Sequence, residues 1–80
     1  MMNADANEPS FEPGEDQIRT LDLLIGGSSN KQIAAALHIS ESAVEFRLAR
    51  LFQLTNSRGR VQLALWWQER KTERRRKRRV

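Results

Sequence analysis

The chain has 80 residues, no cysteine and a single histidine, His38. Without thiols it can form neither a disulfide framework nor a thiolate metal site. One histidine also excludes a multi-histidine metal site and a catalytic set of serine, histidine and aspartate. We therefore expect no catalytic residues, no metal, no cofactor and no small-molecule ligand, and we predict that the protein is not an enzyme.

Long apolar runs are lacking as well. No segment approaches the roughly 18 apolar residues of a membrane span, and the N-terminus has neither the basic start nor the apolar centre of a signal peptide. We expect a cytoplasmic protein with no membrane partner. A chain of 80 residues allows one small domain.

The net charge is +4, but acidic and basic residues are concentrated at opposite ends of the chain. Residues 1–16 carry five carboxylates and no basic side chain, whereas residues 69–80 carry eight basic side chains and two glutamates. Such segregation favours a polyanionic partner, most often nucleic acid. A solvated tail that only improves solubility is the alternative.

Composition divides the chain into three parts. Residues 1–14 contain both prolines and show no periodic apolar pattern, so we interpret them as a flexible acidic arm. Phe11 is the one large apolar residue of this arm, and it can fold back onto the domain. Residues 15–71 form the expected domain, and residues 72–80 form a basic tail.

Four helical segments and no strand signal predict an all-α domain. The first starts after Gly14 and stops at Gly26-Gly27, and Ser28 or Ser29 can cap the second, "NKQIAAALH". Ser40 caps the third, which we expect over residues 41–54. The fourth is expected over residues 58–70, followed by a disordered segment or a frayed helical extension.

The third segment carries an apolar residue on its outer side. At 100° per residue, Val44, Leu48, Leu51 and Phe52 form a buried stripe. Phe46 lies about 160° from Leu48 and faces away from this stripe. An outward ring can contact thymine methyl groups in a DNA groove, or it can pack against the arm or a partner protein. The pattern alone does not favour contact with DNA over packing against the arm or a partner protein.

The order of residues in "GGSSNKQIAAALHISESAVEFRLARLF…SRGRVQLALW" resembles the helix-turn-helix domain of the LuxR/GerE family of bacterial transcription regulators. The block S-N-K-x-I-A…L-x-I-S carries most of the likeness, which extends over residues 17–68. The resemblance implies a four-helix domain that binds double-stranded DNA, here as a small stand-alone regulator. His38 falls at the turn between the second and third helices, where histidine tolerates a positive φ.

Carried over by position, the resemblance implies two sets of DNA contacts. The side chains expected to face bases are Ser42, Glu45, Phe46, Ala49 and Arg50. The side chains expected to contact phosphates are Ser29, Asn30, Lys31, Ser40, Arg47, Arg58 and Arg60. Glu45 departs from the family pattern, which usually has lysine or another polar donor at that position.

The fourth segment is apolar nearly all round in "VQLALWW". A peripheral helix needs one buried face, so a second apolar face predicts a partner. We expect an interface, most simply that of a homodimer as in the family, formed by Leu63, Trp66, Trp67 and Arg70. The alternative is that both tryptophans fold onto the first helix and the arm.

Two other functions remain open from the sequence. In the first, the chain is a protein-interaction module that holds another transcription regulator or an RNA polymerase subunit through the fourth helix and Phe46. In the second, the basic tail dominates and binds nucleic acid without sequence preference. The acidic arm can also shield the basic surface of its own chain.

Overall fold

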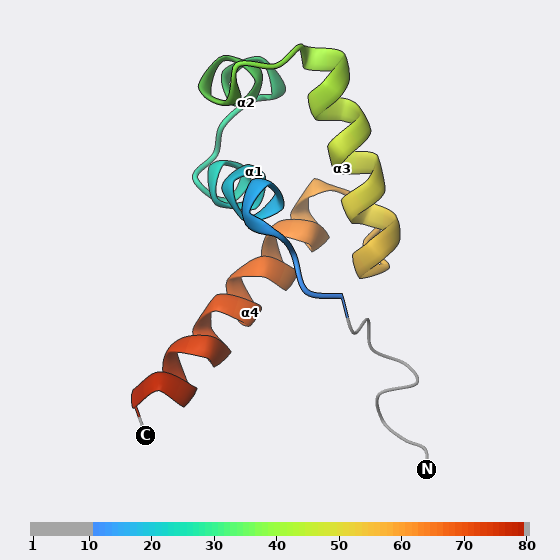
Figure 1. The fold of residues 1–80 in the computed structure, drawn as a ribbon. Coiled ribbons are helices and arrows are strands. Elements are labelled where there is room, and N and C mark those ends of the chain that lie inside the picture. Colours follow the sequence, from blue (N-terminus) through green and yellow to red (C-terminus); the bar gives the residue numbers. More distant parts are fainter. Residues whose placement is uncertain (1–10, 80) are drawn as a thin grey trace.

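The structure, a computed structural model, describes residues 11–79, with side chains through residue 73. Within this range it contains four helices and no strand, which confirms an all-α fold (Figure 1). The helices are α1 (Glu15–Ile25), α2 (Asn30–Leu37), α3 (Glu41–Thr55) and α4 (Arg60–Arg79). α1 packs against both α2 and α4, while α3 packs against α2 and the first part of α4. Most of the arm, residues 1–10, lies outside the described residues.

Side-chain caps define where α2 and α3 begin. The Ser29 hydroxyl accepts from the backbone N–H of Gln32 at 3.1 Å, and the Gln32 carboxamide accepts from the backbone N–H of Ser29 at 2.8 Å. This reciprocal pair satisfies two donors that a helix start otherwise leaves unpaired. At α3 the Ser40 hydroxyl accepts from the Ala43 N–H at 3.0 Å, which confirms the expected cap.

Left-handed backbone positions define where the helices end. His38 closes α2 with φ 60°, and Asn56 closes α3 with φ 56°. Both residue types tolerate this conformation better than most side chains do. The turn from α2 into α3 is therefore only three residues long, and the Ile39 N–H returns to the Ala34 carbonyl at 3.0 Å. This short turn fixes the angle between the two helices of the helix-turn-helix unit.

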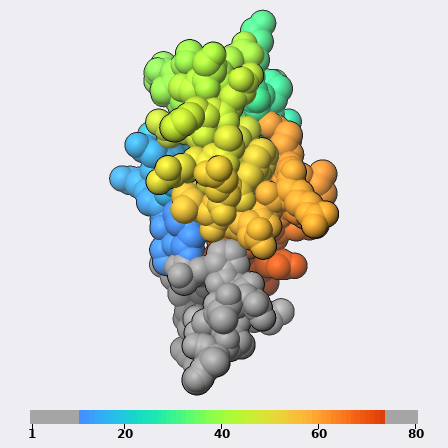
Figure 2. All heavy atoms as spheres, turned by 90° about the vertical axis from the view of Figure 1, so that its right-hand side faces the viewer, coloured from blue at the N-terminus to red at the C-terminus, as the bar shows by residue number. Residues whose placement is uncertain are grey.

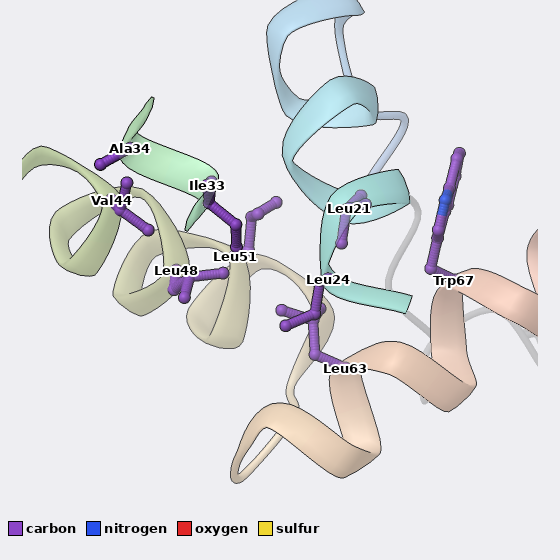
Figure 3. Close-up of a cluster of buried hydrophobic side chains, with 9 residues drawn as sticks. All are labelled: Leu21, Leu24, Ile33, Ala34, Val44, Leu48, Leu51, Leu63 and Trp67. Atoms are coloured by element: carbon purple, nitrogen blue, oxygen red, sulfur yellow. The ribbon is translucent and has the colours of Figure 1, made fainter. Parts of the chain in front are cut away.

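The core draws side chains from all four helices (Figure 3). Its buried apolar members are Leu21, Leu24, Ile33, Ala34, Val44, Leu48, Leu51, Leu63 and Trp67. Phe52, expected in the buried stripe of α3, is only partly buried at the edge of this cluster. Two buried threonines satisfy their hydroxyls locally, since Thr20 donates to the Asp16 carbonyl at 3.0 Å and Thr55 donates to the Leu51 carbonyl at 2.7 Å.

α4 differs from the expected helix over residues 58–70 at both ends. It begins two residues later, at Arg60, and the backbone N–H of Arg58 just before it donates to the Gln62 side chain at 2.7 Å. It also continues beyond residue 70 to Arg79, so of the two expectations for the following segment the structure shows the helical extension. The added residues contain no glycine or proline, and arginine, lysine and glutamate have high helix propensity. No helix in the described range is both long and apolar enough to cross a membrane.

A polar contact joins α1 to α4 beside the core. The Trp67 indole N–H donates to Asp22 Oδ1 at 2.8 Å, and the Lys71 ammonium donates to the same oxygen at 2.9 Å. Partial burial raises the pKa of Asp22, but the hydrogen bonds from Trp67 and Lys71 and the lysine charge outweigh it and leave the pKa below its ordinary value.

This contact predicts a stability loss in acid. Because the pKa of Asp22 is lower in the folded state, its contribution is present above the ordinary carboxylate pKa, near 4, and is lost as the pH falls through the folded value. Asp22→Asn keeps an acceptor for Trp67 but loses the ion pair, so at pH 7 it should lower the free energy of unfolding by at most about 1 kcal/mol. Urea unfolding at pH 7 and pH 3 should show a smaller acid loss in the variant than in the wild type. Glu69→Gln, on the exposed side of α4, is the matched control.

Candidate nucleic-acid interface

α3 separates a packing face from an outer face. Its buried residues, Val44, Leu48, Leu51 and Thr55, point into the domain. Its outer face, meaning the exposed side chains opposite that stripe, consists of Ser42, Glu45, Phe46, Ala49, Arg50 and Gln53. Figure 2 looks onto this side, where α3 runs through the middle with the start of α1 on one flank and the start of α4 on the other. All five residues predicted to face bases therefore lie on one surface.

Phe46 is 72% exposed, which is the highest exposure of any large apolar side chain of α3. It borders an open cleft of about 270 Å³ between α3 and the start of α1. The cleft is lined by Asp16, Gln17, Phe46, Arg47 and Arg50. Phe11, the one large apolar residue of the arm, lies on Trp66 of α4 and not on Phe46, while residues 1–10 of the arm lie outside the described residues.

Gln53 is a residue of the outer face that the sequence interpretation omits. Ser42, Phe46, Ala49 and Gln53 follow spacings of four, three and four residues, which place them along one ridge of a helix. That spacing is visible in the sequence and could have identified Gln53. A carboxamide on this ridge can both donate to and accept from a base edge.

The predicted phosphate-contacting residues fall into groups around this face. Arg60 ties the start of α4 to the start of α2, since its guanidinium donates to Asn30 Oδ1 at 2.6 Å and to the Ser28 carbonyl at 2.9 Å. Lys31 and Arg58 are both exposed. Lys31 lies in the first turn of α2, and Arg58 lies two residues before the start of α4. Arg47 lies apart from them, in the cleft on the α1 flank.

Ser29 and Ser40 have a structural role as well as the predicted one. Both are exposed, and both use the hydroxyl oxygen to accept from a backbone N–H. Each hydroxyl proton remains available for donation, so capping does not prevent contact with a phosphate oxygen. Within the described residues no cluster of three or more histidine and carboxylate side chains is arranged to hold a metal ion.

Comparison with known proteins agrees with this geometry. The family described as bacterial regulatory proteins, luxR family, matches residues 15–67, which is most of the folded chain. The chain belongs to the LuxR family. The match includes α1, α2 and α3 entirely and the first part of α4.

One relative is named for its role. The probable transcriptional regulator ycf29 of Cyanophora paradoxa is 44% identical over 54 residues, which cover 68% of this chain. The matched region spans 25% of the relative, so the chain corresponds to about a quarter of that protein. No solved structure matches the chain. The family description and the name of this relative both refer to regulators.

The structure corrects the predicted partner surface of α4. Leu63 is 0% exposed and Trp67 is 2% exposed, because both pack into the core of the LuxR-family domain. Neither is accessible to a partner in this fold. The alternative interpretation describes what is observed, since Trp67 packs beside α1 (Figure 3) and Trp66 contacts Phe11 of the arm.

Trp66 and Arg70, the other two predicted interface residues, are partly covered by the chain itself. The Phe11 ring stacks on Trp66 with centroids 6.1 Å apart and an interplanar angle of 20°. The Arg70 guanidinium lies 4.8 Å from the Trp66 ring centroid and donates to the Phe11 carbonyl at 2.7 Å. Arg70 also pairs with Glu12 at 3.4 Å. Phe11 and Glu12 therefore hold the end of the arm on α4.

The exposed apolar residues of α4 are Val61, at 74%, and Leu65, at 53%. Two exposed polar residues, Gln68 and Thr72, follow on the same side of the helix. The four positions 61, 65, 68 and 72 are separated by four, three and four residues. These four residues, which we call the α4 stripe, lie along one side of the helix and carry no charge. The stripe replaces Leu63 and Trp67 as the surface of α4 that is open to a partner.

The contact between Phe11 and α4 can be tested by fluorescence. Phe11→Ala removes the stacked ring, so Trp66 should become more exposed, with red-shifted emission and stronger acrylamide quenching. The free energy of unfolding should fall by about 1 to 2 kcal/mol, from the aromatic pair and its buried area. Glu12→Gln, which removes only an exposed ion pair, should leave the emission unchanged. Equal quenching of Phe11→Ala and wild type would contradict this packing.

Proposed function

We propose that the chain is a DNA-binding transcription regulator that inserts the outer face of α3 into the major groove and pairs with a second copy through α4. The observation that carries the proposal is the exposed outer face of α3, centred on Phe46 and bordered by basic side chains. The LuxR family match and the relative named as a transcriptional regulator support the same activity. We place this activity in the cytoplasm.

The dimensions of the unit suit a duplex. An α-helix fits the major groove of B-DNA, and the second helix of a helix-turn-helix unit is the one that enters it. With α3 in the groove, phosphates on one side meet Lys31, Arg58 and Arg60, and phosphates on the other side meet Arg47. Ser29, Asn30 and Ser40 add hydroxyl and amide donors to these contacts.

The α4 stripe supports pairing of two copies. Spacings of four and three residues are those of a seam between two helices, and Val61 and Leu65 supply its apolar part. A symmetric pair of such domains would bind two half-sites on one face of the duplex. Beyond Lys71, which still contacts Asp22 of α1, α4 extends away from the domain (Figure 1).

We keep the division into an arm over residues 1–14, a domain over residues 15–71 and a basic tail over residues 72–80. The contacts of Phe11 and Glu12 show only that the last part of the arm lies on α4. For the tail we propose phosphate contacts without sequence preference, supported by six consecutive arginine and lysine residues in a helical backbone.

Salt-dependent binding tests the DNA contacts. Lys31→Ala and Arg58→Ala should each weaken binding to every duplex by a similar factor and reduce the slope of log affinity against log salt by about 1. Arg19→Ala removes an exposed arginine of α1 outside the predicted set and serves as the control. Fluorescence anisotropy at several salt concentrations, with a duplex selected from a random pool and a scrambled duplex, measures both quantities.

Two results of that experiment would refute the proposal. One is the absence of duplex binding at low salt. The other is equal binding to the selected and scrambled duplexes with an entirely salt-driven affinity, which would leave only non-specific binding by the tail. Removal of residues 74–80 distinguishes sequence-specific binding by the domain from non-specific binding by the tail. A sequence-specific regulator keeps its preference for the selected duplex without these residues, whereas a protein that binds through the tail loses nearly all affinity for DNA.

The α4 stripe predicts the oligomeric state. Leu65→Glu places a charge at the centre of the stripe and should shift the protein from dimer to monomer in sedimentation equilibrium. Because Leu65 is exposed in the monomer, the melting temperature of the folded domain at low concentration should change little. Gln62→Glu adds the same charge outside the stripe and is the matched control. A wild-type protein that is monomeric at all concentrations would refute pairing through α4.

A protein-interaction module remains the second candidate, since Phe46, Val61 and Leu65 are also the kind of side chains that bind a protein. Its predicted anchor Trp67 is in the core, which leaves the α4 stripe and Phe46. Under this alternative, Leu65→Glu or Phe46→Ala would abolish capture of a partner while Lys31→Ala would not. Loss of duplex binding on Lys31→Ala favours the DNA-binding function.

A further inference from the structure

We propose that the outer face of α3 selects pyrimidines on one strand of its target, reading thymine through its methyl group and cytosine through its amino group. Phe46 and Ala49 make the apolar contact, and Glu45 accepts the hydrogen bond. This inference rests on the proposed binding of duplex DNA and specifies which base chemistry that binding recognises.

The first argument concerns the apolar part of the outer face. Phe46 is 72% exposed, and Ala49, one turn further along, is exposed beside it. Of the groups that the four base pairs present in the major groove, the C5-methyl of thymine is the apolar one. Burying this methyl group against the ring removes apolar surface of both partners from water. If the ring packed against the polar edge of another base, that edge would lose its hydrogen bonds to water and gain none from the ring, which is unfavourable.

The second argument concerns Glu45. It is exposed, lies four residues before Ala49 on the same side of α3, and is not in either of the described ion pairs. An ionised carboxylate only accepts hydrogen bonds. Cytosine offers an amino donor, whereas guanine presents the acceptors O6 and N7 and adenine places N7 beside its amino group. The carboxylate therefore favours cytosine, and repulsion from phosphates keeps it near the centre of the groove.

The third argument comes from what surrounds these residues. The ridge of the outer face consists of Ser42, Phe46, Ala49 and Gln53, and none of these is an arginine or lysine. Arg50 borders the cleft beside Phe46, where it can reach a phosphate or a guanine at the edge of the site. Since the acceptor and the apolar pair are adjacent on the helix, the bases that they contact are neighbours. We infer a step in which thymine and cytosine follow each other on one strand.

Thymine and uracil differ by one methyl group, which gives a direct test. In a duplex selected by the wild-type chain, each thymine is replaced singly by deoxyuridine, which keeps every hydrogen-bonding group. At one or two positions wild-type affinity should fall about fourfold, the effect of one buried carbon. Phe46→Ala should bind the parent duplex more weakly and respond less than twofold to the same replacements.

Two matched variants separate the roles of neighbouring residues. Gln53→Ala trims a side chain of the same ridge and should keep the full response to deoxyuridine. Glu45→Gln should lose its preference for cytosine and gain adenine at the same position in a repeated selection, because a carboxamide pairs with adenine. Circular dichroism melting of each variant checks folding, and little change is expected at these exposed positions.

The outcomes distinguish this inference from the proposed function. The inference is wrong, and the DNA-binding function stands, if the chain selects a preferred duplex but no deoxyuridine replacement lowers its affinity. The same holds if the affinity of the Phe46→Ala variant falls as much as that of the wild type on these replacements. A selected site in which no thymine and cytosine follow each other on either strand overturns it equally. A chain that binds no duplex refutes the proposed function, and this inference with it.

Discussion

The packing of α4 across α1 is the constraint on which the other contacts depend. Trp67 and Leu63 fill the space between the two helices, and the indole of Trp67 donates to Asp22 at the edge of that space. Once α4 is held there, its first turn reaches α2 through Arg60, and its later turns provide the surface for Phe11. A small domain has few core side chains, so one buried tryptophan joins most of its parts.

Much of this arrangement could be predicted from the sequence. The serine caps, the turn at His38, the stripe of Val44, Leu48 and Leu51, and the outward direction of Phe46 follow from local rules of capping and periodicity, and the structure shows each of them. The family and the all-α fold follow from a motif with defined spacing. The pairing of Ser29 with Gln32 follows from the same local rules, because glutamine lies three residues after the capping serine.

The errors concern α4, where local rules are insufficient. "VQLALWW" is apolar on more than one side, and the periodic pattern alone does not say which side meets α1. Burial of Leu63 and Trp67 depends on the crossing of two helices that are far apart in sequence, so the two were wrongly assigned to a partner surface. The sequence leaves the end of α4 open between disorder and a helical extension for a related reason, because a charged segment without an apolar stripe gives no periodic signal even when its helix propensity is high. Whether the outer face of α3 contacts bases remains a prediction.

α4 is one uninterrupted helix of 20 residues, about 30 Å long, and not a helix followed by a tether. The α4 stripe and the run of basic residues that follows it share this helix, so the distance between them along the axis is set by the helical rise. Each residue added or removed between them would change this distance by about 1.5 Å. The number of residues in this region therefore fixes how far from the stripe the basic charge lies, which a flexible tether of the same length would leave variable.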